Sequence, residues 1–86
     1  MEVTNITMRV VEKDGLKAIC SLNFNNLLVV HNIRLIEGKE GMFLSFPARV
    51  KGDGNFLDIV HPIDSNFRNE LTTMIINKYN EEKTNI

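Results

Sequence analysis

The stretch that decides the fold is Leu27–Ile36, LLVVHNIRLI, ten residues that contain no Gly or Pro and carry seven large aliphatic side chains. In a β-strand, successive side chains point to opposite faces. The alternation predicts one face that is nearly all apolar and a second that is apolar only at its ends. The nearly all apolar face holds Leu27, Val29, His31, Ile33 and Leu35. The other face holds Leu28, Val30, Asn32, Arg34 and Ile36. Such a strand needs cover on one side and partial cover on the other, so we expect it at the centre of a sheet, with neighbours on both edges.

The residues before this stretch predict two further strands. Residues 3–11 alternate between apolar and polar side chains, as a half-buried strand does. Residues 16–24 alternate more regularly, and the intervening Asp14-Gly15 is typical of a tight hairpin turn in which both central residues have positive φ. Asn25 and Asn26 tolerate the left-handed region and predict a two-residue turn into the central strand. The first part of the chain is therefore expected to be a three-stranded meander.

The residues after it predict shorter strands and one helix. A glycine-containing turn over 37–41 leads to a strand over 42–46, which Pro47 ends, and a short strand is expected over 56–60 after a polar loop, 48–55. From Ser65 the apolar period changes from two to 3.6, with Asp64 or Ser65 as the N-cap. The predicted apolar stripe is Phe67, Leu71, Met74, Ile75 and Tyr79. This helix should cover one face of the sheet, and residues 81–86 are expected to form a solvated tail.

Composition limits the class of protein. The 86 residues form one domain, over 1–80 before the tail, with a net charge of −1 and a pI near 6.1, whereas nucleic-acid-binding domains identified by composition have a pI above about 9. Any basic surface must therefore be local. The single Cys20 excludes an intramolecular disulfide, and no apolar run predicts a membrane span or a signal peptide. We therefore expect a cytoplasmic protein with no membrane association.

Residue types used in catalysis and metal binding are present, but without the spacing that such chemistry requires. His31 and His61 are far apart and have no ligand pair nearby, so hydrogen-bonded structural roles are favoured over metal binding. Cys20 alternates with apolar residues and is expected to be buried. Ser65, His61 and Asp64 contain the residue types of a triad, but helix capping explains them better. The glycines form neither a GxGxxG motif nor a P-loop, so we expect no cofactor, no small-molecule substrate and no enzyme activity.

Three segments together resemble the stage V sporulation protein G (SpoVG) family of bacterial septation and gene-expression regulators. They are the opening MEVT, the run VVHNIRLIEGKEGMFLSFP over 29–47, and DGNFLDIVHPIDSNFRNEL over 53–71. The similarity runs in register from Met1 to about Tyr79. The resemblance implies a small α+β protein that dimerises through its sheet and binds DNA, and in some members RNA, to modulate gene expression linked to sporulation and septation.

In that family the nucleic-acid contact is expected in a basic loop and near the C-terminal helix. Here the loop follows Phe46-Pro47-Ala48 and contains Arg49 and Lys51, while Leu57 stands where the family often has a basic residue. The candidate nucleic-acid-binding residues are Arg49, Lys51, Arg34 and Arg68. A solvated loop that needs charge only for solubility is the alternative for the first two.

Two of these arginines have other possible roles. Arg68 lies in the first turn of the predicted helix, where it can extend an anion site or pair with Asp64 or Asp58; the structural pairing is slightly preferred. Arg34 lies in the middle of the central strand, where a solvated or dimer-facing position competes with nucleic-acid contact.

We therefore predict an α+β fold: an antiparallel sheet of four or five strands, a C-terminal amphipathic helix across it, and a homodimer formed through edge strands or through the second face of the central strand. A two-fold dimer would duplicate the segment around Arg49. The first functional hypothesis is a regulator that binds DNA or RNA. The second is a protein-interaction module in septation or sporulation that binds no nucleic acid.

Overall fold

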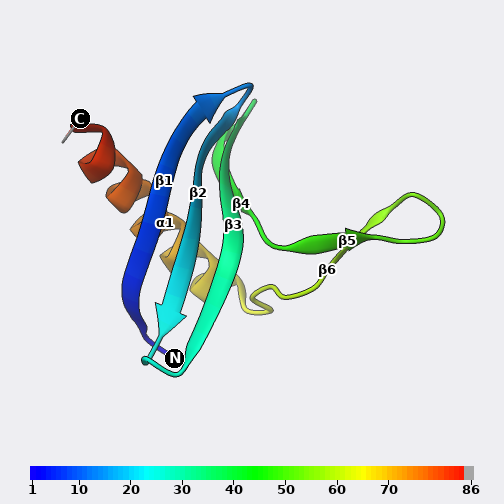
Figure 1. The fold of residues 1–86 in the computed structure, drawn as a ribbon, viewed down its shortest axis with the longest axis horizontal. Helices are drawn as coiled ribbons and strands as arrows, with labels where there is room; N and C mark the ends of the chain where they lie inside the picture. Colours follow the sequence, from blue (N-terminus) through cyan, green and yellow to red (C-terminus); the bar gives the residue numbers. More distant parts are fainter. Residues whose placement is uncertain (85–86) are drawn as a thin grey trace.

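The computed structural model describes residues 1–84 and shows a two-layer α+β arrangement (Figure 1). One layer is a four-stranded antiparallel sheet in the order β1-β2-β3-β4, and the other is the helix α1, which crosses behind it. The sheet strands are β1 (Val3–Lys13), β2 (Leu16–Phe24), β3 (Leu28–Gly38) and β4 (Gly41–Ser45), and the helix spans Ser65–Thr84. The predicted fold class is confirmed, with β3 between β2 and β4.

Left-handed backbone at the predicted turns shapes the meander. Asp14 and Gly15 have φ of 53° and 87°, so the β1–β2 hairpin has positive φ at both central residues, as predicted. Asn25 and Asn26, with φ of 56° and 58°, open the next turn. That turn also includes Leu27, because β3 begins at Leu28, so the predicted two-residue connection is one residue longer.

The predicted faces of β3 are wrong because the strand contains a β-bulge. Cys20 pairs with Ile33 whereas Leu22 pairs with Val30, so one residue of β2 lies opposite two residues of β3. The extra residue is accommodated at Asn32, which has a φ of 60°. After the bulge the alternation resumes on the opposite parity. Val30 and Ile33 consequently share the face toward α1, and His31 lies on the opposite face from Ile33 rather than beside it.

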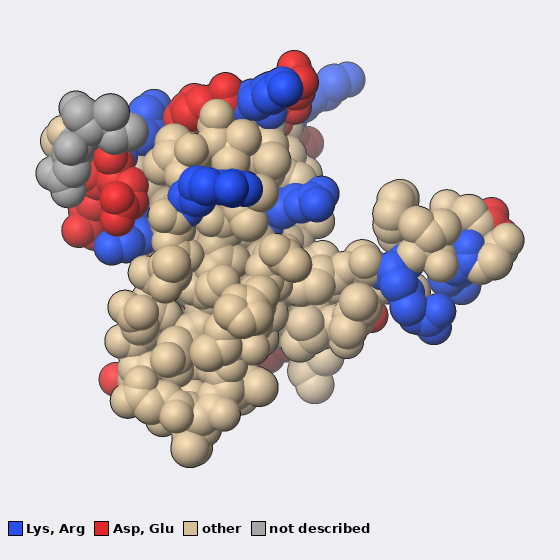
Figure 2. Space-filling model, viewed as in Figure 1, with Lys and Arg blue, Asp and Glu red and all other residues tan. Residues whose placement is uncertain are grey.

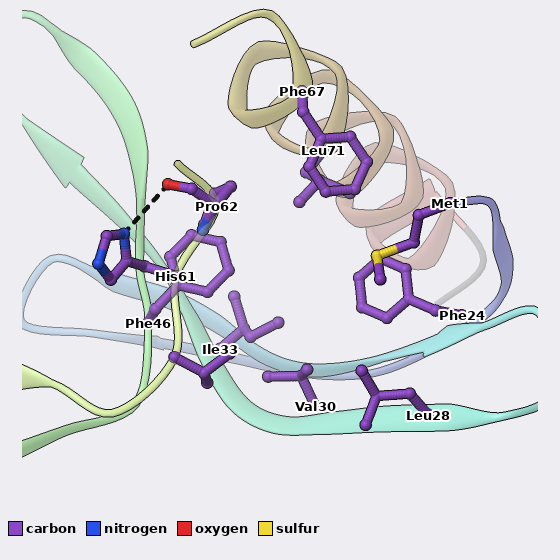
Figure 3. Close-up of a pocket in the computed structure, with 11 residues that line it drawn as sticks. Met1, Phe24, Leu28, Val30, Ile33, Phe46, His61, Pro62, Phe67 and Leu71 are labelled. Atoms are coloured by element: carbon purple, nitrogen blue, oxygen red, sulfur yellow. Dashed lines mark hydrogen bonds between the residues drawn. The ribbon is translucent and has the colours of Figure 1, made fainter. Parts of the chain in front are cut away.

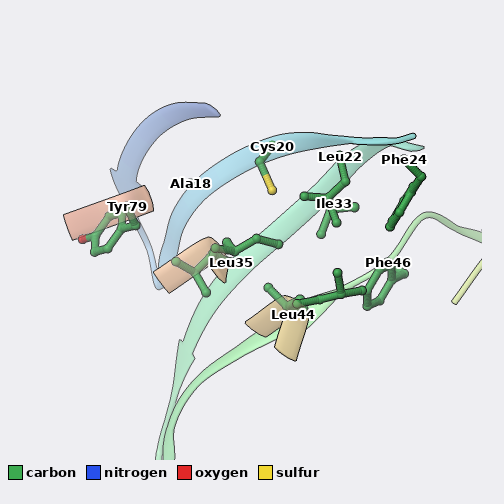
Figure 4. Packing of buried hydrophobic residues seen from close by; sticks show 11 residues of the cluster. Ala18, Cys20, Leu22, Phe24, Ile33, Leu35, Leu44, Phe46 and Tyr79 are labelled. Atoms are coloured by element: carbon green, nitrogen blue, oxygen red, sulfur yellow. The ribbon is translucent and has the colours of Figure 1, made fainter. Parts of the chain in front are cut away.

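The core lies between the sheet and α1 (Figure 4). Alternate residues of β2 from Ala18 to Phe24 point into it, as their period-two pattern predicted. The buried set is Ala18, Cys20, Leu22, Phe24, Ile33, Leu35, Leu44, Phe46, Leu71, Ile75 and Tyr79. The predicted helical stripe is confirmed at Leu71, Ile75 and Tyr79, which are buried, and Phe67 is half-buried. Met74 is exposed, and Ile76 packs against the core in its place.

Both ends of α1 are fastened by side chains. At the start, Phe67 N donates to Asp64 Oδ2 over 2.7 Å, so Asp64 is the N-cap. Near the other end, the Tyr79 hydroxyl donates to Glu12 on β1, and Lys83 Nζ lies 3.7 Å from Glu12 Oε1. The hydrogen bond from Tyr79, followed by the charges of the nearby lysines, lowers the pKa of Glu12.

The segment after β4 differs from the prediction. Residues expected to form a polar loop and a strand of the main sheet instead form a separate antiparallel hairpin, β5 (Ala48–Val50) and β6 (Phe56–Asp58). Pro47 separates this hairpin from β4, and the hairpin projects from the edge of the body (Figure 1). Of the tail expected over 81–86, residues 81–84 continue α1, and 85–86 lie outside the described residues.

Candidate nucleic-acid interface

The projecting hairpin carries Arg49 and Lys51 on one face. Arg49 pairs with Leu57 in the β5–β6 ladder, and Lys51 N donates to Asn55 O over 2.7 Å, which extends the ladder by one position. Because side chains alternate along a strand, residues 49 and 51 project to the same side. Figure 2 shows the basic side chains of the hairpin grouped together, away from the acidic side chains of the body.

The loop of this hairpin is ordered by its own hydrogen bonds. Gly54 N donates to Lys51 O over 3.0 Å, and Asn55 N donates to Asp53 Oδ1 over 3.0 Å. Gly54 has a φ of 90°, a backbone conformation that glycine adopts without steric cost. Ile59 N also donates to Pro47 O over 2.7 Å, which closes the base of the hairpin. The two cations are therefore presented by a short two-stranded element and not by an open loop.

Neither cation is neutralised within the hairpin. Among residues 1–84, the carboxylates that lie within 4.0 Å of a lysine or arginine nitrogen are those of Glu12, Glu37 and Glu82, all on the body. Arg49 and Lys51 are exposed and take no part in those pairs. Both side chains are thus available to an external anion.

The other two candidate residues lie on different surfaces. Arg34, on β3, is exposed on the sheet face away from α1, opposite Ser45 of β4. Arg68 is half-buried on the helix side, where its guanidinium carbon lies 5.1 Å from the centroid of the Phe46 ring. This cation–π contact replaces the preferred pairing with Asp64 or Asp58 and holds the first turn of α1 against the end of β4. The four residues do not form a single patch.

A further arginine was missed by the sequence analysis. Arg9 of β1 pairs with Ile19 of β2, which in turn pairs with Arg34 of β3, so the two arginines flank Ile19 in one row across the sheet. The available signal was the position of Arg9 on the polar parity of its strand. The row itself depends on the bulges in β1 and β3, which the pattern of residue types did not predict.

The residues weighed for catalysis or metal binding make structural contacts. His31 Nδ1 lies 2.9 Å from Ser21 Oγ on the outer face of the sheet, and His61 Nδ1 lies 3.1 Å from the carbonyl oxygen of Pro62. Cys20 is buried, and desolvation raises the pKa of its thiol to about 11, so it stays protonated at neutral pH. Asp64 caps the helix that Ser65 begins.

An apolar recess opens where the core ends, between β3 and the start of α1 (Figure 3). Its volume is about 160 Å³. Phe24, Leu28 and Val30 line it from the sheet and Phe67 from the helix, while the segment with His61 and Pro62 forms another wall. The described residues that line it are mostly apolar and include no Asp, Glu, Lys or Arg, so the recess suits an apolar side chain.

Exposed apolar side chains follow the same segment of the chain. Val50, Phe56 and Leu57 on the hairpin are 61%, 74% and 44% exposed, and Ile59 and Ile63 beyond it are 65% and 95% exposed. Contiguous exposed apolar side chains commonly mark an interaction surface.

No helix within residues 1–84 has both the length and the apolar character needed to cross a membrane.

Comparison with known proteins matches most of the chain to one family. The model of the SpoVG family matches residues 1–81. A relative from Finegoldia magna is 45% identical over 83 residues, which cover 95% of this chain and 77% of the relative. A relative from Agathobacter rectalis is 42% identical, and the match covers 100% of this chain and 100% of the relative. A relative from Clostridioides difficile is also 42% identical, and the match covers 94% of this chain and 89% of the relative. All three bear the provisional name septation protein SpoVG.

Proposed function

The chain belongs to the SpoVG family, and from that premise we propose that it is a nucleic-acid-binding regulator of gene expression, linked to septation and sporulation. The observation that carries the proposal is the unpaired Arg49 and Lys51 on one face of a projecting hairpin. Lysine and arginine side chains bind phosphates and release counterions, a gain that does not require a basic protein overall. In this proposal the chain is not an enzyme and needs no cofactor.

Self-association completes the proposed site. Two cations provide little affinity, but a two-fold homodimer would present two hairpins at a fixed spacing to one polyanion. In this dimer the second copy would bury two apolar surfaces: the exposed side chains of Val50 and Phe56, and the apolar recess between β3 and α1. We expect sedimentation to show a dimer, and Phe56→Ser to raise the dimer dissociation constant. A wild-type chain that stays monomeric at micromolar concentration contradicts this part.

Salt-dependent binding tests the proposal directly. A fluorescent duplex DNA pool and a single-stranded RNA pool are titrated with the full chain and with Arg49→Ala/Lys51→Ala at several salt concentrations. In the proposed dimer the variant loses four phosphate contacts, two on each hairpin, which should reduce the slope of log K against log salt by about 3.6 for duplex DNA, whereas a chain that binds as a monomer would lose about 1.8. Lys39→Ala/Lys78→Ala removes the same charge elsewhere and should not change the slope. An unchanged slope in the hairpin variant contradicts the assignment of these residues.

The second candidate function is a protein-interaction module without nucleic-acid binding. The exposed apolar side chains of Phe56, Ile59 and Ile63 favour it. Absence of binding to both pools at low salt, together with a purified protein partner whose affinity falls with Phe56→Ser, would support this alternative over the first.

A further inference from the structure

No element within residues 1–84 covers the face of the sheet turned away from α1, and the strand residues on that face include no carboxylate. Its residues follow from the strand registers: Asn5, Thr7, Arg9, Lys13, Leu16, Ile19, Ser21, Asn23, Val29, His31, Arg34, Ile36, Phe43 and Ser45. Figure 2 views this face and shows basic side chains set in a largely uncharged surface, with the acidic side chains near its rim. The charged groups of the face are therefore all cationic.

The two arginines of this face are held at a fixed spacing. Arg9 and Arg34 lie two strands apart in one row, with Ile19 between them, so their Cα atoms are separated by about 10 Å. Neither guanidinium lies within 4.0 Å of a carboxylate of residues 1–84. A guanidinium binds phosphate through two parallel hydrogen bonds and also stacks on flat rings.

Groups that interact with nucleobases surround the arginine row. Phe43 pairs with Ile36 on the next row, and the residue is 48% exposed. Its edge lies over Gly38, where an added Cβ would come within 3.0 Å of Phe43 Cε1, so the glycine leaves room for the ring against the sheet. On the other side of the row a shallow hollow is lined by Thr7, Ser21 and His31 among others, which offer hydrogen-bonding groups.

We propose that this open sheet face binds single-stranded nucleic acid, with Arg9 and Arg34 on the phosphates and Phe43 stacked on a base. Aromatic side chains and cations on an exposed sheet form a platform on which unpaired bases lie flat. Duplex DNA is a poorer fit, because its major groove admits a helix or a two-stranded ribbon and not the width of four strands. The inference rests on the proposed nucleic-acid function and adds a second site, separate from the hairpin, with a preference for unpaired strands.

A second copy of the chain is a less favourable occupant of this face. A two-fold contact across the face would bury four guanidinium groups, two from each copy, in a surface whose strand residues offer no carboxylate. Burying like charges without partners is costly, whereas a polyanion supplies the missing opposite charge.

The test compares two paired variants of the full chain. Binding of labelled single-stranded RNA, single-stranded DNA and duplex DNA pools of about 16 nucleotides is measured with Arg9→Gln/Arg34→Gln and with Arg49→Gln/Lys51→Gln. The sheet variant should lose about 1.4 from the salt slope for single strands, a loss of affinity of about 25-fold at 0.1 M salt, while duplex binding is nearly unchanged. Phe43→Ala should weaken single-strand binding by about 5- to 150-fold without altering that slope.

Lys39→Gln/Lys78→Gln is the charge-matched control, and thermal melts verify that each variant is folded. Single-strand binding with a wild-type salt slope in Arg9→Gln/Arg34→Gln overturns the inference while the hairpin proposal stands. A sheet variant that binds normally but changes oligomeric state shows instead that a second copy covers the face. If the wild-type chain binds none of the pools, the proposed function fails and this inference fails with it.

Discussion

The body of the molecule and its projecting hairpin use the same residue types in opposite ways. In the body, Ile33 and Leu35 of β3 are fully buried against α1. In the hairpin, Val50 and Leu57 are exposed, and the ladder to which they belong has only two short strands. A hairpin of this size is marginally stable by itself in water. The body therefore buries its apolar side chains within the chain, whereas the hairpin leaves its own exposed to solvent.

The largest expected effect contrasts two leucines. Leu35→Ala should reduce the free energy of unfolding by about 2–5 kcal/mol, because it removes a fully buried side chain and leaves a cavity. Leu57→Ala, on the hairpin, should change it by less than about 0.5 kcal/mol in the monomer. Urea unfolding at low protein concentration measures both. A comparable loss for Leu57→Ala would mean that the hairpin is already packed against a partner.

The bulge in β3 gives the next largest effect. Asn32→Val should destabilise the body by about 1–2 kcal/mol, because a β-branched residue tolerates the left-handed conformation poorly. Asn32→Gly keeps that conformation accessible and serves as the matched control, with little loss expected. Equal stability of the two variants in urea unfolding would argue against a left-handed residue 32.

The capping carboxylate gives a smaller effect. Asp64→Ala should cost about 1 kcal/mol, since the N–H of Phe67 loses its acceptor at the start of α1. Asp58→Ala, on the exposed strand β6, removes a carboxylate of the same kind and should be nearly neutral. Thermal melts of the two variants compare an aspartate of the body with one of the hairpin.

The smallest effect is a pH dependence at Glu12. Because its pKa is lowered in the folded chain, the unfolded chain binds more protons at mildly acidic pH. The resulting stabilisation is present above the unfolded pKa and is lost as the pH falls through the lowered folded pKa. Glu12→Gln should therefore flatten the fall in melting temperature between about pH 6 and pH 3. An equally steep fall in the variant would assign the acid sensitivity to other groups.

The strands of the meander and the helix could be predicted because each depends on a local periodic pattern. Residues 16–24 and the Asp14-Gly15 turn specify their own conformation, and the helical stripe at Leu71, Ile75 and Tyr79 follows from its spacing. The family resemblance was confirmed by the match over residues 1–81. These features require no knowledge of which strands meet.

The faces of β3 and the placement of the candidate site could not be predicted in the same way. Asn32 is an ordinary strand residue by position, and only its pairing with β2 shows that it is inserted. The separate pairing of β5 with β6 likewise depends on a partner and not on local pattern. The strand pairing determines whether Arg34 and Arg68 share a surface. The two arginines lie on opposite sides of the sheet.

The single inserted residue in β3 also determines what the outer surface can display. If Asn32 were paired as a regular strand residue, His31 and Arg34 would project to opposite sides, because three positions separate them and a regular strand reverses direction at each step. With the bulge, Val30 before Asn32 and Ile33 after it both face inward, while His31 and Arg34 share the outer face. Deleting residue 32 would therefore leave His31 and Arg34 two positions apart and on the same face, so a regular strand without the bulge would keep the inner and outer residues of β3 unchanged.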